Sequence, residues 1–388
     1  MQKVIIMKRR PFRKLNWKVS ALGFGVMRLP TIGGDAAKIN EPLATRMLRY
    51  AIDHGVNYLD TAYSYHGGNS ETFVGKVLQE GYRKKVKLAT KMPTWFVNSQ
   101  QDMDKYLDEQ LVRLKTNIDF YLLHSLNKER WQKLKELNVI AWAEKKIEEG
   151  KFSHFGFSFH DTYDVFRDII DSYNGWTLCQ IQYNYVDADH QAGTEGLKYA
   201  VSKGLAVVVM EPVAGGRLAI TPPRQVQSLW KRAKIKRTPA ELALLWVWNH
   251  PEVSVALSGM STMQQVMENV KTANCSVPPT LSQDELRFVS QLARKYKKLG
   301  FIGCTSCKYC MPCDEGVSIP EIIAFMNEFF IKQASEEVKT KYHEHIRPEN
   351  QAKRCVRCGK CEQNCPQQLP IRDILSRAVW IFEHTDQQ

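Results

Sequence analysis

Long apolar runs are scarce in this sequence. The most apolar stretches, Leu242–Val247 and Leu205–Met210, are far shorter than the ~20 residues that a membrane-spanning helix needs. Near the N-terminus, the short apolar stretch Val4–Met7 is followed by Lys8-Arg9-Arg10, whereas a secretory leader has a longer apolar region with the charges in front of it. We therefore expect no membrane partner, no secretory leader and a cytoplasmic location.

Cysteine is almost missing from the first 300 residues. Cys179 and Cys275 are the two exceptions, and the other eight of the ten cysteines form two short runs near the C-terminus. A disulfide framework spreads its cysteines along a small secreted domain, so this distribution indicates metal or cluster ligands instead. We expect the two isolated thiols to be buried packing residues.

The sequence also has no concentrated basic segment, although its formal net charge is +13. Its basic residues are scattered, as in Lys84-Lys85 and Lys297-Lys298, and no basic helix is interleaved with aromatic residues. We expect these residues to form solvated faces, or faces that attract acidic small molecules or acidic electron carriers. Nucleic acid is not an expected partner.

An alternation of short apolar runs with helical periodicity fills the chain from Val19 to Met260. Continuous apolar strands that alternate with helices indicate a parallel sheet, because each parallel crossover needs a long connection. Eight such units in about 240 residues predict an α/β fold of the closed (β/α)₈ TIM barrel type. The eight runs are Ser20–Gly25, Tyr58–Ala62, Val86–Thr90, Phe120–His124, His154–Phe159, Cys179–Tyr183, Ala206–Glu211 and Val253–Ser258.

Further elements are expected on both sides of the barrel. Val4–Met7 and a segment around Phe12–Leu15 are predicted to form a hairpin that closes the bottom of the barrel. Leu281–Leu299 is predicted to be a helix, and a helical stretch at Pro320–His345 separates the two cysteine runs. These patterns predict a barrel domain at residues 1–278, then a linker helix and a small, mainly helical domain at residues 279–388.

Four polar residues stand at the predicted carboxyl ends of barrel strands, where barrels of this type carry their chemistry. Asp60 ends the second strand and Tyr65 follows it, while Lys91 and His124 end the third and fourth. Singly, each has a structural explanation, as a helix cap, a packed loop residue, a solvated cation or a hydrogen-bonded core histidine. Together they are the acid–base set that carbonyl reduction needs. The phenol would donate a proton, the ammonium would lower its pKa, the carboxylate would orient the ammonium and the imidazole would direct the carbonyl oxygen.

With these residues the chain resembles the aldo-keto reductase family, whose Asp, Tyr, Lys and His tetrad is matched by Asp60, Tyr65, Lys91 and His124. The resemblance spans roughly residues 12–275. It implies a hydride transfer from NADP or NAD in its reduced form to an aldehyde or ketone, or the reverse reaction on an alcohol, with Tyr65 as proton donor. Because this family is also recruited as non-enzymatic subunits, a second hypothesis stays open. In this hypothesis the barrel is a docking or nucleotide-sensing scaffold of an electron-transfer module.

The resemblance also implies a set of cofactor contacts. Ser158 and Gln180 would hold the nicotinamide carboxamide, which needs both a donor and an acceptor. Glycines after the seventh strand would let backbone N–H groups approach the pyrophosphate, and a loop and helix after the eighth strand would bind the adenosine. The implied residues are Gly25, Met27, Ser158, Gln180, Met210, Glu211, Pro212, Gly215, Gly216, Ser258, Gly259, Met260, Gln265, Glu268 and Asn269.

Three positions depart from the family pattern. Phe159-His160 stands where the family often has Asn after the strand-five serine, and Met210 replaces an aromatic ring that packs on the nicotinamide. Ser261 and Thr262 occupy the region where NADP-specific members place a basic side chain. The choice between NADPH and NADH therefore stays open, as does the substrate.

The two cysteine runs have cluster-type spacing. The first is Cys304-x₂-Cys307-x₂-Cys310-x₂-Cys313, and the second is Cys355-x₂-Cys358-x₂-Cys361-x₃-Cys365-Pro366. The second run has the spacing of bacterial ferredoxins, in which the fourth cysteine ligates the other cluster. We therefore predict a ferredoxin-like domain with two 4Fe-4S clusters, one on Cys304, Cys307, Cys310 and Cys365, the other on Cys355, Cys358, Cys361 and Cys313.

Alternatives exist for both the metal and its role. Two zinc sites are the competing reading, although four cysteines within ten or eleven residues suit a cluster better. In the first run the last gap is one residue short and Pro312 precedes Cys313, so spacing alone does not settle its crossed ligation. Clusters usually move one electron whereas nicotinamide moves a hydride, and no flavin motif is present. Either a redox partner such as a ferredoxin or flavoprotein, or another cofactor, connects the two, or the clusters are structural, docking or redox-sensing elements.

Overall fold

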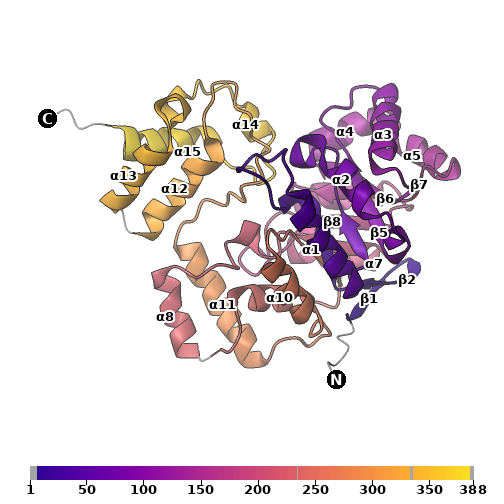
Figure 1. Cartoon of the computed structure of the whole chain (residues 1–388), viewed down its shortest axis with the longest axis horizontal. Coiled ribbons are helices and arrows are strands. Elements are labelled where there is room, and N and C mark those ends of the chain that lie inside the picture. Colours follow the sequence, from indigo (N-terminus) through magenta and orange to yellow (C-terminus); the bar gives the residue numbers. More distant parts are fainter. Residues whose placement is uncertain (1–6, 234, 333–334, 385–388) are drawn as a thin grey trace. The chain divides into compact units, whose positions relative to one another are not determined.

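The computed structural model describes residues 7–233, 235–332 and 335–384 (Figure 1). The chain forms two compact units. One comprises Met1–Val213 and Ala240–Leu286, and the other comprises Ala214–Pro239 and Arg287–Gln388. The segment after the seventh barrel strand thus folds with the C-terminal unit.

The first unit is a closed barrel of eight parallel strands in sequence order, which confirms the predicted (β/α)₈ fold. Each predicted apolar run overlaps one strand, with shifted ends, because residues buried on both faces of a parallel sheet are nearly all apolar. The barrel strands are β3 (Leu22–Gly25), β4 (Tyr58–Asp60), β5 (Lys87–Met92), β6 (Ile118–Leu126), β7 (Phe152–Phe159), β8 (Leu178–Gln182), β9 (Ala206–Met210) and β10 (Val253–Ser258).

Helices cover the outside of this barrel (Figure 1). Their starting points are encoded locally: the side chains of Asn40, Ser99, Asn127 and Thr262 each accept a backbone N–H of the first turn that follows. The helices of this unit are α1 (Glu41–Asp53), α2 (Ser70–Val77), α3 (Gln100–Leu114), α4 (Lys128–Glu136), α5 (Val139–Glu148), α6 (Tyr163–Asp171), α7 (Gly193–Ser202), α9 (Pro239–Trp248) and α10 (Met263–Ala273).

An antiparallel hairpin precedes the barrel, formed by β1 (Arg9–Phe12) and β2 (Leu15–Ser20). The ring of Phe12 packs against Tyr58 and Phe120, with centroid distances of 6.2 and 5.0 Å. Since both partners lie toward the amino ends of their strands, the hairpin closes that end of the barrel, as expected.

The predicted position of one hairpin strand was wrong. Phe12–Leu15 contains the turn between the strands, and Val4–Ile6 of the other predicted strand lies outside the described residues. The sequence did not indicate β1 because this strand contains a charged residue, Arg10. The side chain of Arg10 is nevertheless buried, since its guanidinium donates to three backbone carbonyls. The acceptors are those of Trp248, His250 and Ser276.

The second unit is mainly helical. Its core lies between α12 (Ile319–Ile331), α13 (Glu336–His345) and α15 (Ile371–Ala378), and cysteine side chains of both runs pack against it. The other helices are α8 (Arg224–Ala233) and the short α14 (Lys360–Gln363), while α11 (Gln283–Lys298) begins in the first unit and ends in the second.

Two details correct the sequence predictions. The helical stretch Pro320–His345 is two helices, since α12 ends at Ile331 and Ser335 is extended at the N-cap position of α13, with acidic residues in the first turn after it. Cys179 is buried as expected, but Cys275 is exposed because it lies in the turn that follows α10.

Within the described ranges, no helix has the length and apolar character needed to cross a bilayer.

Candidate functional site

Asp60, Tyr65 and Lys91 meet inside the carboxyl-end rim of the barrel. The Lys91 ammonium lies 2.5 Å from Asp60 Oδ1, 2.7 Å from the carbonyl oxygen of Thr61 and 3.3 Å from Tyr65 Oη. All three side chains are buried. Burial lowers the pKa of Lys91, while the neighbouring Asp60 carboxylate opposes this by favouring the ammonium form.

His124 completes the constellation from the next strand, β6. Its ring lies 5.9 Å from the Tyr65 ring, edge to face, and Thr94 Oγ1 donates to its carbonyl oxygen at 2.6 Å. Burial lowers the pKa of His124 well below its usual range, and the positive charge of Lys91 acts in the same direction. The imidazole is therefore neutral near pH 7, which suits a hydrogen-bond donor to a carbonyl oxygen.

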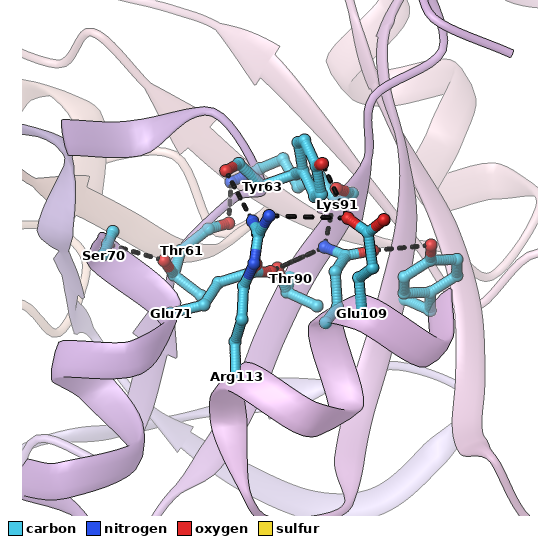
Figure 2. A network of polar contacts seen from close by, with 10 residues as sticks. Thr61, Tyr63, Ser70, Glu71, Thr90, Lys91, Glu109 and Arg113 are labelled. Atoms are coloured by element: carbon cyan, nitrogen blue, oxygen red, sulfur yellow. Dashed lines mark hydrogen bonds and ion pairs between the residues drawn. The ribbon is translucent and has the colours of Figure 1, made fainter. Parts of the chain in front are cut away.

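A buried polar network fixes the backbone around Lys91, and the sequence had not indicated it (Figure 2). Glu71, on α2, accepts from Thr90 Oγ1 and from Gln110 Nε2, each at 2.6 Å. Gln110, on α3, also donates to the carbonyl oxygen of Lys91 at 3.0 Å. Arg113 contacts the same Glu71 carboxylate at 3.4 Å. Burial raises the pKa of Glu71, and the hydrogen bonds from Thr90 and Gln110 and the charge of Arg113 oppose this shift.

One signal for this network was present in the sequence. On α3 the buried residues Met103, Leu107, Gln110 and Leu114 recur at helical spacing, so Gln110 is a polar side chain on an apolar stripe. A buried amide must find hydrogen-bond partners. Its position therefore pointed to a polar contact inside the protein.

Ser158 and Gln180 lie side by side on neighbouring strands, since their Cα atoms are register partners in β7 and β8. Ser158 Oγ accepts from the backbone N–H of Ser125 at 2.6 Å, which leaves its O–H as a donor. Gln180 Nε2 donates to Asp60 Oδ2 at 2.5 Å, and its buried Oε1 accepts no hydrogen bond within the described part of the chain. One donor and one acceptor at this place fit a carboxamide.

The residues predicted to hold adenosine also form a connected group after β10. Asn269 Nδ2 donates to Ser258 Oγ at 3.0 Å, and the Gln265 side chain accepts from the N–H of Ser261 at 2.8 Å. Gly259 and Met260 directly follow β10, and Glu268 lies on α10, where its carboxylate accepts from Gln264. The structure thus brings the loop and the helix together.

The remaining predicted cofactor residues follow β3 and β9. Gly25 ends β3 opposite Asp60 of β4, and Met27 lies in the 3₁₀ turn that follows. Met210 ends β9, Glu211 adopts a left-handed conformation with φ 54°, and Pro212 comes next.

Gly215 and Gly216 belong to the C-terminal unit. Both have positive φ, 67° and 101°. A side chain at Gly215 would also come within 2.9 Å of the backbone of Thr305, whereas the space around Gly216 is open. Close packing against the first cysteine run is therefore a second reason for glycine at position 215.

The eight clustered cysteines line two cavities in the C-terminal unit. One cavity is bordered by Cys304, Cys307, Cys310 and Cys365. The other, of about 330 Å³, is bordered by Cys313, Cys355, Cys358 and Cys361, with Cys310 at its edge. Burial raises the pKa of Cys310, and the neighbouring thiols of Cys307, Cys304 and Cys365 act in the same direction.

Both runs fold their first three cysteines in the same way. The residues on either side of the second cysteine are left-handed in each run: Ser306 and Lys308 at φ 53° and 64°, Arg357 and Gly359 at φ 57° and 82°. The N–H of Ser306 lies 3.4 Å from Cys304 Sγ. The two loops thus have equivalent backbone conformations, although their sequences share little apart from cysteine.

Within the part of the chain that the structure describes, no three His, Cys, Asp or Glu side chains are gathered closely enough for a single metal ion.

Comparison with known proteins agrees with both units. The aldo/keto reductase family model matches residues 21–290, and the 4Fe-4S dicluster domain model matches residues 303–369. L-galactose dehydrogenase of Arabidopsis thaliana is 29% identical over 301 residues, which cover 73% of this chain and 93% of that protein. A putative voltage-gated potassium channel subunit beta of Schizosaccharomyces pombe is 28% identical, over 68% of this chain and 88% of its own.

Solved structures show the same similarity. The holo form of an aldo-keto reductase, AKR11C1 of Bacillus halodurans, aligns with a TM-score of 0.63 at 28% identity, over 74% of this chain and 96% of that one. An aldo-keto reductase of Klebsiella pneumoniae in complex with NADPH aligns with a TM-score of 0.58 at 25% identity, over 75% and 95% of the two chains.

Proposed function

This chain belongs to the aldo/keto reductase family of NAD(P)-dependent oxidoreductases, and we propose that it reduces an aldehyde or ketone to the alcohol, or catalyses the reverse reaction. The observation that carries the proposal is the contact of the Tyr65 phenol with the Lys91 ammonium at 3.3 Å, together with the 2.5 Å contact between that ammonium and Asp60. A phenol beside a buried ammonium is a proton donor poised for work near neutral pH.

Each side chain has a distinct part in the reaction. When bound, the reduced nicotinamide supplies a hydride, and with it two electrons, to the carbonyl carbon. Tyr65 gives its hydroxyl proton to the carbonyl oxygen as the C=O bond becomes a C–O single bond, so that the alcohol and the oxidised nicotinamide are the products. Lys91 stabilises the phenolate that is left, and neutral His124 donates a hydrogen bond to the same oxygen.

We propose that Ser158 and Gln180 hold the nicotinamide carboxamide and that the groups after β3, β9 and β10 hold the rest of the dinucleotide. The donor on Ser158 and the unpartnered acceptor on Gln180 support this. NADPH is the first cofactor to test, because the similar Klebsiella pneumoniae enzyme is in complex with it.

We further propose two 4Fe-4S clusters with crossed ligation. Cys365 of the second run would join Cys304, Cys307 and Cys310, while Cys313 of the first run would join Cys355, Cys358 and Cys361. The grouping of thiols around two cavities supports this assignment.

A second candidate function is electron exchange between these clusters and an acidic carrier such as a ferredoxin or flavoprotein. Cys358 is exposed, as are Lys353 and Arg354, which precede it in the sequence. A cluster ligand at a basic surface favours an encounter with an acidic protein.

One anaerobic assay separates the two functions. Purified protein with its clusters is mixed with NADPH or NADH and a panel of aldehydes and ketones, and then with benzyl viologen as one-electron acceptor. We expect carbonyl-dependent oxidation of the nicotinamide, with one alcohol formed per cofactor oxidised. If the nicotinamide were oxidised only when the viologen is present, and with none of the carbonyls, the result would favour the electron-transfer module and contradict the reductase.

A further inference from the structure

The side chain of Arg130 lies near the carboxyl-end rim of the barrel, where the rings of Trp95 and His124 separate it from Tyr65. The Arg130 guanidinium lies over the Trp95 ring, with Cζ 5.6 Å from the ring centroid. The Trp95 ring is 5.0 Å from the His124 ring, which is itself 5.9 Å from the Tyr65 ring. These side chains form a continuous row from the proposed proton donor to the guanidinium.

The local sequence holds Arg130 in this position. Asn127 begins α4 by accepting the N–H of Arg130 at 2.9 Å, and Arg130 Nη1 donates back to the carbonyl oxygen of Ser125 at 2.8 Å. The side chain therefore folds over the first turn of α4 toward the end of β6. A cation in the first turn opposes the helix dipole, so the stability of the helix does not explain this residue.

Two histidines near Arg130 carry no positive charge at neutral pH. Burial lowers the pKa of His160 to about 4 and that of His124 well below its usual range, so both rings are neutral near pH 7. The ammonium of Lys91 is held by Asp60. The Asp161 carboxylate accepts the N–H groups of Lys128 and Thr162 at the start of α4 and α6.

We propose that Arg130 binds a carboxylate of the substrate, and that the enzyme acts on small oxo acids, meaning aldehydes or ketones that carry a carboxylate. The inference rests on the proposed carbonyl reduction. A guanidinium presents a planar fork of N–H donors that matches a carboxylate. Trp95, between Arg130 and His124, would pack along the carbon chain that joins the carboxylate to the carbonyl group.

The test compares matched substrates that differ only in the charged group. The pairs are 4-oxobutanoate with butanal, and 4-carboxybenzaldehyde with its methyl ester, and glyceraldehyde 3-phosphate tests phosphate as the anion instead. The proteins are the wild type, Arg130→Gln, Arg130→Lys and the control Lys128→Gln, which removes an exposed charge from the same helix. Competition by 4-hydroxybutanoate for binding provides a readout that does not depend on turnover.

We expect the wild type to prefer each acid over its neutral partner by at least about tenfold in kcat/KM. Arg130→Gln should lower kcat/KM for the acids by about 10- to 100-fold and weaken 4-hydroxybutanoate binding, with the neutral partners changed by less than about threefold. Arg130→Lys should recover part of the loss, and Lys128→Gln should resemble the wild type.

Three results would overturn the inference. Equal kcat/KM for acids and neutral partners in the wild type would do so without any variant, as would equal losses for both in Arg130→Gln. A preference for glyceraldehyde 3-phosphate over the carboxylates would make phosphate the ligand. In each of these cases the proposed carbonyl reduction stands, whereas a wild type that reduces none of the compounds would overturn both.

Discussion

Replacing Tyr65 by phenylalanine is expected to lower kcat for carbonyl reduction by about 10²- to 10⁴-fold, the usual contribution of a positioned general acid. The substitution removes the hydroxyl that contacts Lys91 at 3.3 Å and keeps the ring that packs edge to face against His124. The proton donor is lost, while the shape of the site is kept. Turnover and cofactor binding are measured on the same preparation, the latter by quenching of tryptophan fluorescence.

The matched control for this variant is Tyr63→Phe. The hydroxyl of Tyr63 donates to Glu109 at 2.7 Å and belongs to the outer part of the network in Figure 2. This variant loses the same atom from the same loop and should keep kcat within about threefold of the wild type. If Tyr65→Phe bound the cofactor normally and retained wild-type turnover, the phenol would not be the proton donor.

Two double substitutions should leave different amounts of iron, because the proposed ligation is crossed. Cys304→Ala with Cys365→Ala removes two ligands of one cluster and should keep about four irons per chain. Cys304→Ala with Cys313→Ala removes one ligand from each cluster and should keep little iron. Iron and acid-labile sulfide are measured in anaerobically purified protein, together with visible absorption.

Ligation within each run makes the opposite prediction, since the first pair would then damage both clusters and the second pair only one. Cys275→Ala is the control, because this exposed thiol lies outside both runs and its loss should leave about eight irons. Stoichiometric zinc in the wild type, without brown colour, would refute clusters of either arrangement.

The barrel could be predicted because its strands are buried on both faces. Runs such as Ala206–Met210 are therefore continuously apolar, and their alternation with helices has few solutions. The tetrad could be predicted for a related reason. Asp60 ends an apolar strand and Lys91 is the last residue but one of the next, and a closed barrel brings those ends to one rim.

Contacts between distant segments account for what the sequence did not reveal. The charge of Arg10 concealed β1, because its three carbonyl acceptors lie about 240 to 270 residues away along the chain. Glu71 resembles a surface residue of an amphipathic helix until its partner on β5 is known. The packing of Gly215 against Thr305 likewise joins segments that no local pattern connects.

The grouping of the cysteines was also predictable only in part. Spacing predicted that both runs bind clusters, and the paired left-handed residues around Cys307 and Cys358 give the two runs the same local fold. Spacing could not place Cys313, whose gap differs from the ferredoxin pattern. Its position at the cavity bordered by Cys355 and Cys361 depends on how the intervening helices pack.

The central claim is that a carbonyl carbon receives hydride directly from nicotinamide within the barrel. Its most direct test uses reduced NADPH that carries deuterium at the transferable position of C4, with mass spectrometry of the alcohol. We predict one deuterium per molecule on the carbinol carbon, and none at that carbon when the unlabelled cofactor is used in deuterated water. An alcohol that takes its carbinol hydrogen from solvent would contradict the account.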